Sequence, residues 1–175
     1  MKWSDIPRLT DCNDSGPQYS LKEFVEHIGK EVTEWGLVLN PDFQRGHVWT
    51  EEQQVAFVEF MLMGGKSANV VYFNAPDWPS TYNDGTYVCV DGLQRITALQ
   101  RFINNEIKVF GHYFDEFEGR LSITRCSMEI RVNNLKTREQ VIQWYLEMNT
   151  GGTPHSKEEI DRVKELLKQA KQEEN

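Results

Sequence analysis

Four helix-start signals divide this chain, and strand-like segments lie between them. In each signal a Ser or Thr is followed three residues later by Glu or Gln, so that each side chain can bind the other residue's backbone N–H. The pairs are Ser20 with Glu23, Thr50 with Gln53, Thr137 with Gln140, and Ser156 with Glu159. Apolar residues at helical spacing follow each pair, which predicts four helices. In the last one the charged remainder is expected to face solvent.

Strand signals are short runs of β-branched and aromatic residues. They cover residues 69–73, 86–90, 107–110 and 128–132, with a weaker run at 36–39. Helices and strands mix without strict alternation, which predicts an α+β (mixed α/β) fold with a small central sheet and surrounding helices. The 175 residues suit one domain. We expect an irregular N-terminal arm over 1–19 and a single domain over 20–175 that ends in the charged helix.

Composition excludes several classes of protein. No apolar run approaches the roughly 20 residues of a membrane span, and the first residues lack the apolar core of a secretory signal. Three widely spaced cysteines do not form a disulfide framework, so a cytoplasmic protein without membrane contact is expected. The net charge of −8 weighs against a broad nucleic-acid surface, although it allows one local basic pocket.

The first of three polar clusters covers residues 41–49, between a short strand and a capped helix. A loop there can present Gln44 and Arg45 while Phe43 and Trp49 anchor it. The alternative is an ordinary turn whose arginine pairs with a nearby carboxylate.

The second cluster, Asp91-Gly92-Leu93-Gln94-Arg95, directly follows a strand and opens a helix. Gly92 permits a tight turn and the close approach of a ligand. The first helical turn offers free backbone N–H groups, and Arg95 adds a positive fork for a phosphate or carboxylate. The alternative is purely structural: Asp91 caps the helix, Gln94 completes a capping box and Arg95 is solvated.

The third cluster, residues 149–154, contains Asn149 and the pair Gly151-Gly152 between the last two helices. It is either a polar loop that closes over a ligand or a helix end followed by a turn.

Together these clusters resemble the GmrS-like family with the DGQQR signature, which is related to the ParB/sulfiredoxin fold. The matching segments are Pro41-Asp42-Phe43-Gln44-Arg45 with Trp49, Asp91-Gly92-Leu93-Gln94-Arg95 with Thr97, and Asn149-Thr150-Gly151-Gly152-Thr153-Pro154 with Ser156. They occur in the family's order and spacing across residues 36–165. The chain resembles a stand-alone short member, because 175 residues leave no room for the nuclease domain that often follows.

The resemblance implies a ParB-like domain, linked to restriction or phage defence, that binds and often hydrolyses a nucleoside triphosphate. By position, the signature site would comprise Asp91, Gln94 and Arg95 with Gln44 and Arg45 beside it, and Gly92, Asn149, Gly151 and Gly152 would help to bind the phosphates. We hypothesise that Arg95 and Arg45 neutralise the phosphates, that Asp91 holds Mg²⁺, and that Gln44 or Gln94 orients the attacking water. Leu93 replaces the first Gln of the signature, which threatens hydrolysis more than binding.

Two other functions remain open. A groove lined by Arg45, Arg95 and Arg101 could engage DNA as a ParB-like nuclease does, although the acidic charge argues against it. The chain could instead be a non-catalytic interaction protein that regulates a full-length defence protein.

Overall fold

The computed structural model describes residues 17–46, 48–78, 87–119, 121, 126–149 and 157–173. Its elements, in chain order, are β1 (Gln18–Ser20), α1 (Leu21–Trp35), α2 (Glu51–Leu62), β2 (Val70–Asn74), β3 (Val88–Asp91), α3 (Leu93–Ile103), the 3₁₀ turn η2 (Phe114–Glu116), β4 (Ser127–Asn133), α4 (Arg138–Asn149) and α5 (Lys157–Glu173). This is an α+β fold with a small mixed sheet and surrounding helices, as predicted.

The sheet has the order β1-β4-β2-β3. Strands β2 and β4 are parallel, whereas β1 pairs with β4 and β2 pairs with β3 in the antiparallel sense. Gln18 and Tyr19, which the prediction assigned to the irregular arm, belong to the edge strand β1. Residues 1–16 of that arm lie outside the described part of the chain.

The predicted helix starts hold where the structure describes them. Ser20 with Glu23 and Thr50 with Gln53 form complete capping boxes at α1 and α2. At the start of α4, Thr137 and Gln140 exchange the same pair of side-chain to backbone bonds. The fourth signal begins at Ser156, which lies outside the described residues. Local capping chemistry therefore sets these helix starts.

The predicted strand over 107–110 is wrong. Ile107 and Val109 are buried, as an alternating strand would have them. However, Val109 pairs only with His112 across a tight turn in which Phe110 and Gly111 both have positive φ. The alternating pattern of apolar residues over 107–110 thus results from burial against the core, and not from pairing with a neighbouring strand. The weaker run at 36–39 contributes a single bridge, from Val38 to Val88.

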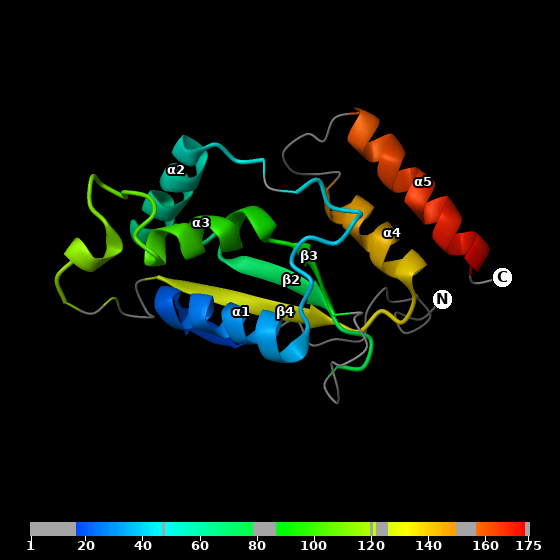
Figure 1. Cartoon of the computed structure of the whole chain (residues 1–175), viewed down its shortest axis with the longest axis horizontal. Helices are drawn as coiled ribbons and strands as arrows, with labels where there is room; N and C mark the ends of the chain where they lie inside the picture. The colour runs from blue at the N-terminus through cyan, green and yellow to red at the C-terminus, as the bar shows by residue number, and fades with distance from the viewer. Residues whose placement is uncertain are drawn as a thin grey trace, which may run out of the picture.

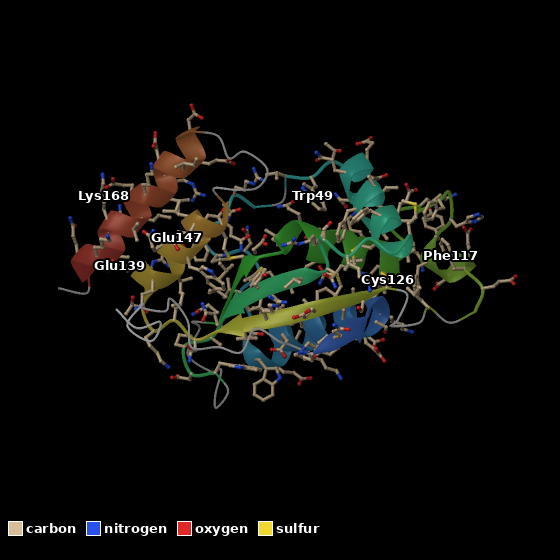
Figure 2. All side chains as sticks on the ribbon, turned by 180° about the vertical axis from the view of Figure 1, so that it is seen from behind. Trp49, Phe117, Cys126, Glu139, Glu147 and Lys168 are labelled. Atoms are coloured by element: carbon tan, nitrogen blue, oxygen red, sulfur yellow. The ribbon has the colours of Figure 1, made fainter. Side chains whose placement is uncertain are left out.

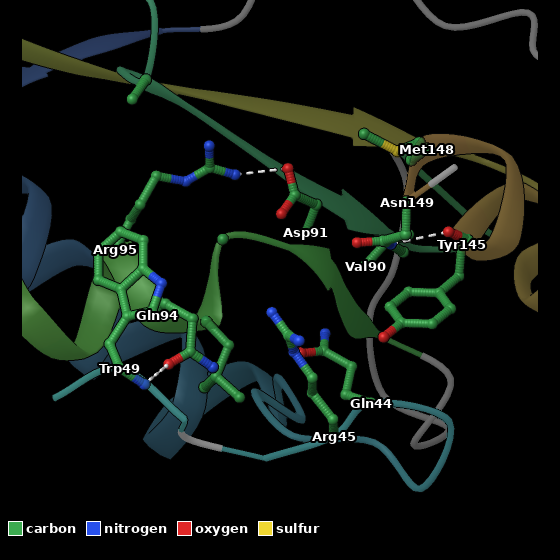
Figure 3. A pocket seen from close by; sticks show the side chains of 13 residues that line it. Gln44, Arg45, Trp49, Val90, Asp91, Gln94, Arg95, Tyr145, Met148 and Asn149 are labelled. Atoms are coloured by element: carbon green, nitrogen blue, oxygen red, sulfur yellow. Dashed lines mark hydrogen bonds and ion pairs between the residues drawn. The ribbon is translucent and has the colours of Figure 1, made fainter. Parts of the chain in front are cut away.

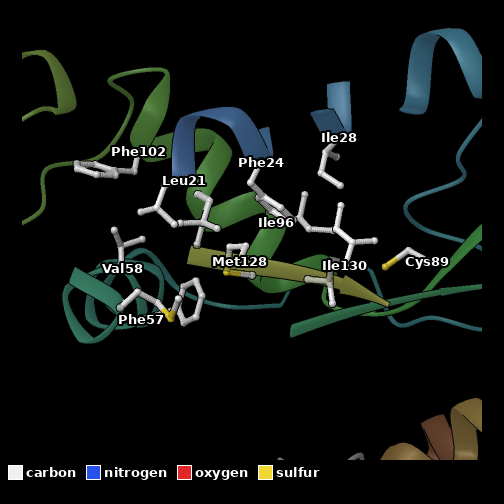
Figure 4. Packing of buried hydrophobic residues seen from close by; sticks show 14 of the residues in the cluster. Leu21, Phe24, Ile28, Phe57, Val58, Cys89, Ile96, Phe102, Met128 and Ile130 are labelled. Atoms are coloured by element: carbon white, nitrogen blue, oxygen red, sulfur yellow. The ribbon is translucent and has the colours of Figure 1, made fainter. Parts of the chain in front are cut away.

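Two apolar clusters use opposite faces of the sheet. The main core joins α1, α2 and α3 to one face, through side chains that include Phe24, Phe57, Ile96 and Met128 (Figure 4). On the other face, Tyr72 meets Trp144 of α4 edge to face. The second cluster joins the end of β3 to α4, α5 and the loop after Val38; its buried members are Phe43, Val90, Leu135, Val141, Ile142, Tyr145, Val163 and Ala170.

Helices α4 and α5 lie side by side at one end of the molecule, and the segment that carries η2 lies at the other (Figure 1). Seen from behind, Glu139, Glu147 and Lys168 mark the first end and Phe117 the second (Figure 2). Val163 and Ala170 of α5 face inward, while residues such as Asp161 and Lys168 are exposed. The charged remainder of α5 is thus a solvated face, as predicted.

The turn from β3 into α3 depends on Gly92. Its φ of +127° is a conformation that residues with a side chain rarely adopt, and a Cβ there would lie 2.5 Å from Cγ1 of Val71 on β2. The backbone of this turn therefore packs directly on the neighbouring strand. This contact fixes the direction in which α3 leaves the sheet.

We predict that Gly92→Ala lowers the free energy of unfolding by about 2–4 kcal/mol, since backbone strain adds to the clash with Val71. Urea denaturation measures the change. Gly29→Ala is the matched control, because Gly29 lies inside α1 and a Cβ there meets nothing within 4 Å. The control should gain about 0.5–1 kcal/mol. Equal effects of the two substitutions would contradict this account of Gly92.

Candidate functional site

A cavity of about 280 Å³ opens where the β3–α3 turn, the loop over 41–49 and the end of α4 meet (Figure 3). It is lined by Gln44, Arg45, Trp49, Ala68, Val90, Asp91, Gly92, Leu93, Gln94, Arg95, Tyr145, Met148 and Asn149. The structure thus brings together seven of the nine residues that sequence reasoning chose for the site. The other two, Gly151 and Gly152, lie outside the described residues.

The start of α3 forms the floor of this cavity. Gly92 is the N-cap residue, and its carbonyl accepts the first helical hydrogen bond, from Ile96. No side chain caps this end of the helix, which rules out the predicted alternative that Asp91 is the cap. The N–H groups of the first turn have no partner inside the helix and carry the positive end of its dipole. They can therefore bind an anion.

Gln94 connects α3 to the loop that forms one wall of the cavity. Its Oε1 accepts hydrogen bonds from the backbone N–H groups of Val48 and Trp49, at 3.0 and 3.1 Å. Its Nε2 donates to the carbonyl of Gly46 at 2.6 Å. The carboxamide of Gln94 thus holds the loop against α3. It does not form the capping box that the structural alternative predicted.

Arg95 lies in the wall of the cavity with 18% of its side chain exposed, so it is not the solvated residue of the structural alternative. Its Nη2 donates to Oδ2 of Asp91 at 2.5 Å. Its Nε is buried and has no hydrogen-bond partner among the described residues. A buried donor without a partner costs free energy, so a ligand that accepts from this N–H would bind favourably.

The loop over 41–45 places Gln44 and Arg45 opposite Arg95. Nε2 of Gln44 donates to the carbonyl of Cys89 at 2.6 Å and ties the loop to β3. Nη1 of Arg45 lies 3.8 Å from Oε2 of Glu159 on α5. The predicted alternative, an arginine paired with a nearby carboxylate, therefore describes the contact of Arg45 correctly.

Helix α5 holds this loop from outside. Arg162 donates to the carbonyls of Asp42 at 2.5 Å and of Gln44 at 2.9 Å. Arg138 at the start of α4 binds both carboxylate oxygens of Asp42. Because a guanidinium offers several donors in a fixed plane, these contacts define the shape of the loop as well as its position.

Tyr145 is a lining residue that the sequence analysis did not choose for the site. It packs against Phe43, and its backbone carbonyl accepts a hydrogen bond from Nδ2 of Asn149. Burial raises the pKa of its phenol, while the charges of Arg45 and Arg162 act in the opposite direction. Its position on the inward face of a helix gave no signal that would separate it from ordinary core residues.

The donor set constrains the predicted magnesium site. No cluster of three or more His, Cys, Asp or Glu residues that could hold a metal occurs in the described ranges. Of the described lining residues, Asp91 alone has a carboxylate, and Arg95 already binds it. One carboxylate can hold Mg²⁺ when phosphates and waters complete the shell. These residues therefore fit an ion that arrives with a triphosphate better than a resident metal.

We predict that Gln94→Ala lowers the free energy of unfolding by about 1–3 kcal/mol, because three backbone groups of the loop lose their partner. Hydrogen exchange should also become faster at the amides of Val48 and Trp49. Gln100→Ala, at a half-buried position on the same helix, is the control and should change neither quantity appreciably. Unchanged exchange at both amides would show that Gln94 does not hold the loop.

A second prediction concerns pH. Burial raises the pKa of the Cys89 thiol to about 12, from an ordinary value of 9.0. Above pH 9 the unfolded chain loses this proton and the folded chain keeps it, so stability falls as pH rises, by up to about 1.4 kcal/mol per pH unit. Urea unfolding from pH 8 to 10.5 should show a steeper loss for the native sequence than for Cys89→Ala. Parallel curves would contradict this.

Comparisons with known proteins give one family. The family model described as "GmrSD restriction endonuclease, N-terminal domain" matches residues 21–126, which is more than half of the chain. The comparisons with curated proteins and with solved structures give no match. Among the described residues no helix is both long and apolar enough to span a membrane. The chain belongs to the family of N-terminal domains of GmrSD restriction endonucleases, and this membership links it to restriction and phage defence.

Proposed function

We propose that the cavity at the start of α3 binds a nucleoside triphosphate, with the phosphates at the first turn of the helix. One observation carries the proposal: three segments far apart in the sequence bring two arginines and a free helix start into one cavity. These are the loop with Gln44 and Arg45, the turn from Asp91 to Arg95, and the end of α4.

The donors suit phosphate. The N–H groups at the start of α3 can donate to an anion, and Arg95 adds its unpartnered Nε. Arg45 lines the same cavity with 19% of its side chain exposed, so both arginines can take part in binding a chain of phosphates. Arginine is suited to this role because its planar fork can bind two phosphate oxygens at once.

The remaining lining suits a nucleoside. Trp49, Tyr145 and Met148 contribute aromatic and apolar surface beside the polar groups. Aromatic faces stack on bases with little regard to sequence. A cavity with apolar walls and a few well-placed donors is the usual form of a small-molecule site.

Hydrolysis would require a group that orients water. Gln94 is occupied by the loop, since its oxygen and its nitrogen both bind backbone groups. We therefore assign this role to Gln44, whose nitrogen binds Cys89 and whose amide oxygen would accept a hydrogen bond from the water. Leu93, at the position where the family signature has Gln, is 9% exposed and supplies no polar group. Magnesium held by Asp91 would neutralise phosphate charge when bound.

Thermal-shift titration with ATP, GTP, CTP and UTP, each with and without Mg²⁺, tests binding. At a hundredfold excess over Kd, a ligand adds about 2.7 kcal/mol, which for a chain of this size raises Tm by roughly 5–10 °C. We expect such a shift with at least one nucleotide and its loss in Arg95→Ala. Phosphate release from the nucleotide that binds then tests hydrolysis, and we expect Gln44→Ala to reduce it.

The matched control is Arg101→Ala. Arg101 lies on the same helix but outside the cavity, where it pairs with Glu51 and Glu106. Its loss should lower the starting Tm and leave the ligand-induced shift intact. No shift with any nucleotide would overturn the proposal and would favour a DNA-acting or purely protein-binding role for the chain.

A further inference from the structure

We propose that Glu159 of α5 competes with the ligand for Arg45. The Glu159 carboxylate pairs with Arg45 until a phosphate group of the ligand displaces it. The inference rests on the binding function proposed above and adds a regulation to it. Helix α5 lies outside the residues that the family model matches, so family membership assigns it no role.

Each of the two arginines at the cavity is paired with a carboxylate of this chain. Arg95 is bound by Asp91, and Arg45 faces Glu159. The Tyr145 phenol lies among the same charges: burial is the main cause of its raised pKa, Arg45 and Arg162 act against that rise, and Glu159 and Asp91 add to it. A phosphate that binds in the cavity therefore competes with one carboxylate for each arginine: Asp91 in the lining for Arg95, and Glu159 on α5 for Arg45.

The two internal pairs differ in how easily they can be replaced. Asp91 and Arg95 are four residues apart at the same turn and approach to 2.5 Å. Glu159 stands 3.8 Å from Arg45, near the outer limit of an ion pair, and 29% of its side chain is exposed. A partly exposed pair at this distance is weak. Of the two pairs, Arg45 with Glu159 is therefore the one that a phosphate replaces more readily.

Neighbouring contacts keep α5 in place during this exchange. One turn after Glu159, Arg162 binds backbone carbonyls of the loop, and Val163 is buried in the second apolar cluster. The exchange at Arg45 thus needs no separation of α5 from the loop. Because coupling between two binding events is reciprocal, a carboxylate that weakens ligand binding is itself displaced by the ligand.

Isothermal titration calorimetry of Glu159→Gln tests the proposal. The probes are inorganic tripolyphosphate and the four nucleoside triphosphates, at about 0.15 M salt, where the Debye length is about 8 Å. We expect binding to the variant to be about three- to fivefold tighter than to the native sequence, the upper part of the range that a partly exposed ion pair contributes. Glu159→Ala should show the same gain, which protects the test against a folding defect in one variant.

Asp161→Asn is the matched control. Asp161 lies on the same helix at an exposed position, and its substitution changes the net charge by the same amount. It should bind every probe within about twofold of the native sequence, because distant exposed charges are screened. A gain of the same size in this control would reveal an effect of net charge alone and would overturn the role of Glu159.

The remaining outcomes separate this inference from the function on which it rests. If the native protein binds a probe and both Glu159 variants bind it with equal or weaker affinity, the competing role of Glu159 is overturned. The proposed binding function then still stands. Binding by the Glu159 variants and not by the native protein would be the strongest support for the competing role of Glu159. Binding of no probe by any variant overturns the proposed function, and the competitor with it.

Discussion

The close contact between Gly92 and Val71 is the constraint on which the rest of the site depends. Because Gly92 has no side chain, the backbone between β3 and α3 can pack against Val71 of β2. This contact orients the N-terminal end of α3 toward the loop over 41–49. The side chain of Gln94 then binds backbone groups of that loop. The absence of a side chain at this one residue thus allows a sheet, a helix and a loop to meet around the same cavity.

Sequence reasoning predicted features that depend on neighbouring residues. The capping pairs at Thr50 and Thr137 hold because each satisfies backbone groups only three residues away. It failed for the pattern over 107–110, because burial alone produces the same alternation as a strand. The residues chosen for the site lie together, yet no spacing could show that Gln94 binds a loop or that Glu159 faces Arg45. Those contacts join positions at least 45 residues apart and exist only in the folded chain.

The second apolar cluster makes α4 and α5 part of the site. Phe43, which lies within the family match, is buried against Tyr145 and other side chains beyond it. Arg162 and Arg138 then bind the same short loop through its carbonyls and through Asp42. The loop that carries Gln44 and Arg45 is therefore shaped as much by the last two helices as by the region that defines the family. Relatives with other sequences after β4 would present these two side chains differently.

The bonds from Arg162 to the carbonyls of Asp42 and Gln44 also bear on when the site matures. They join residues about 120 positions apart, so they can form only after the chain as far as Arg162 has left the ribosome. The sheet and α3 can assemble earlier from β1 to β4, since long-range contacts of this kind are the slow ones to close. The nascent domain would therefore acquire a stable core first and a competent cavity last.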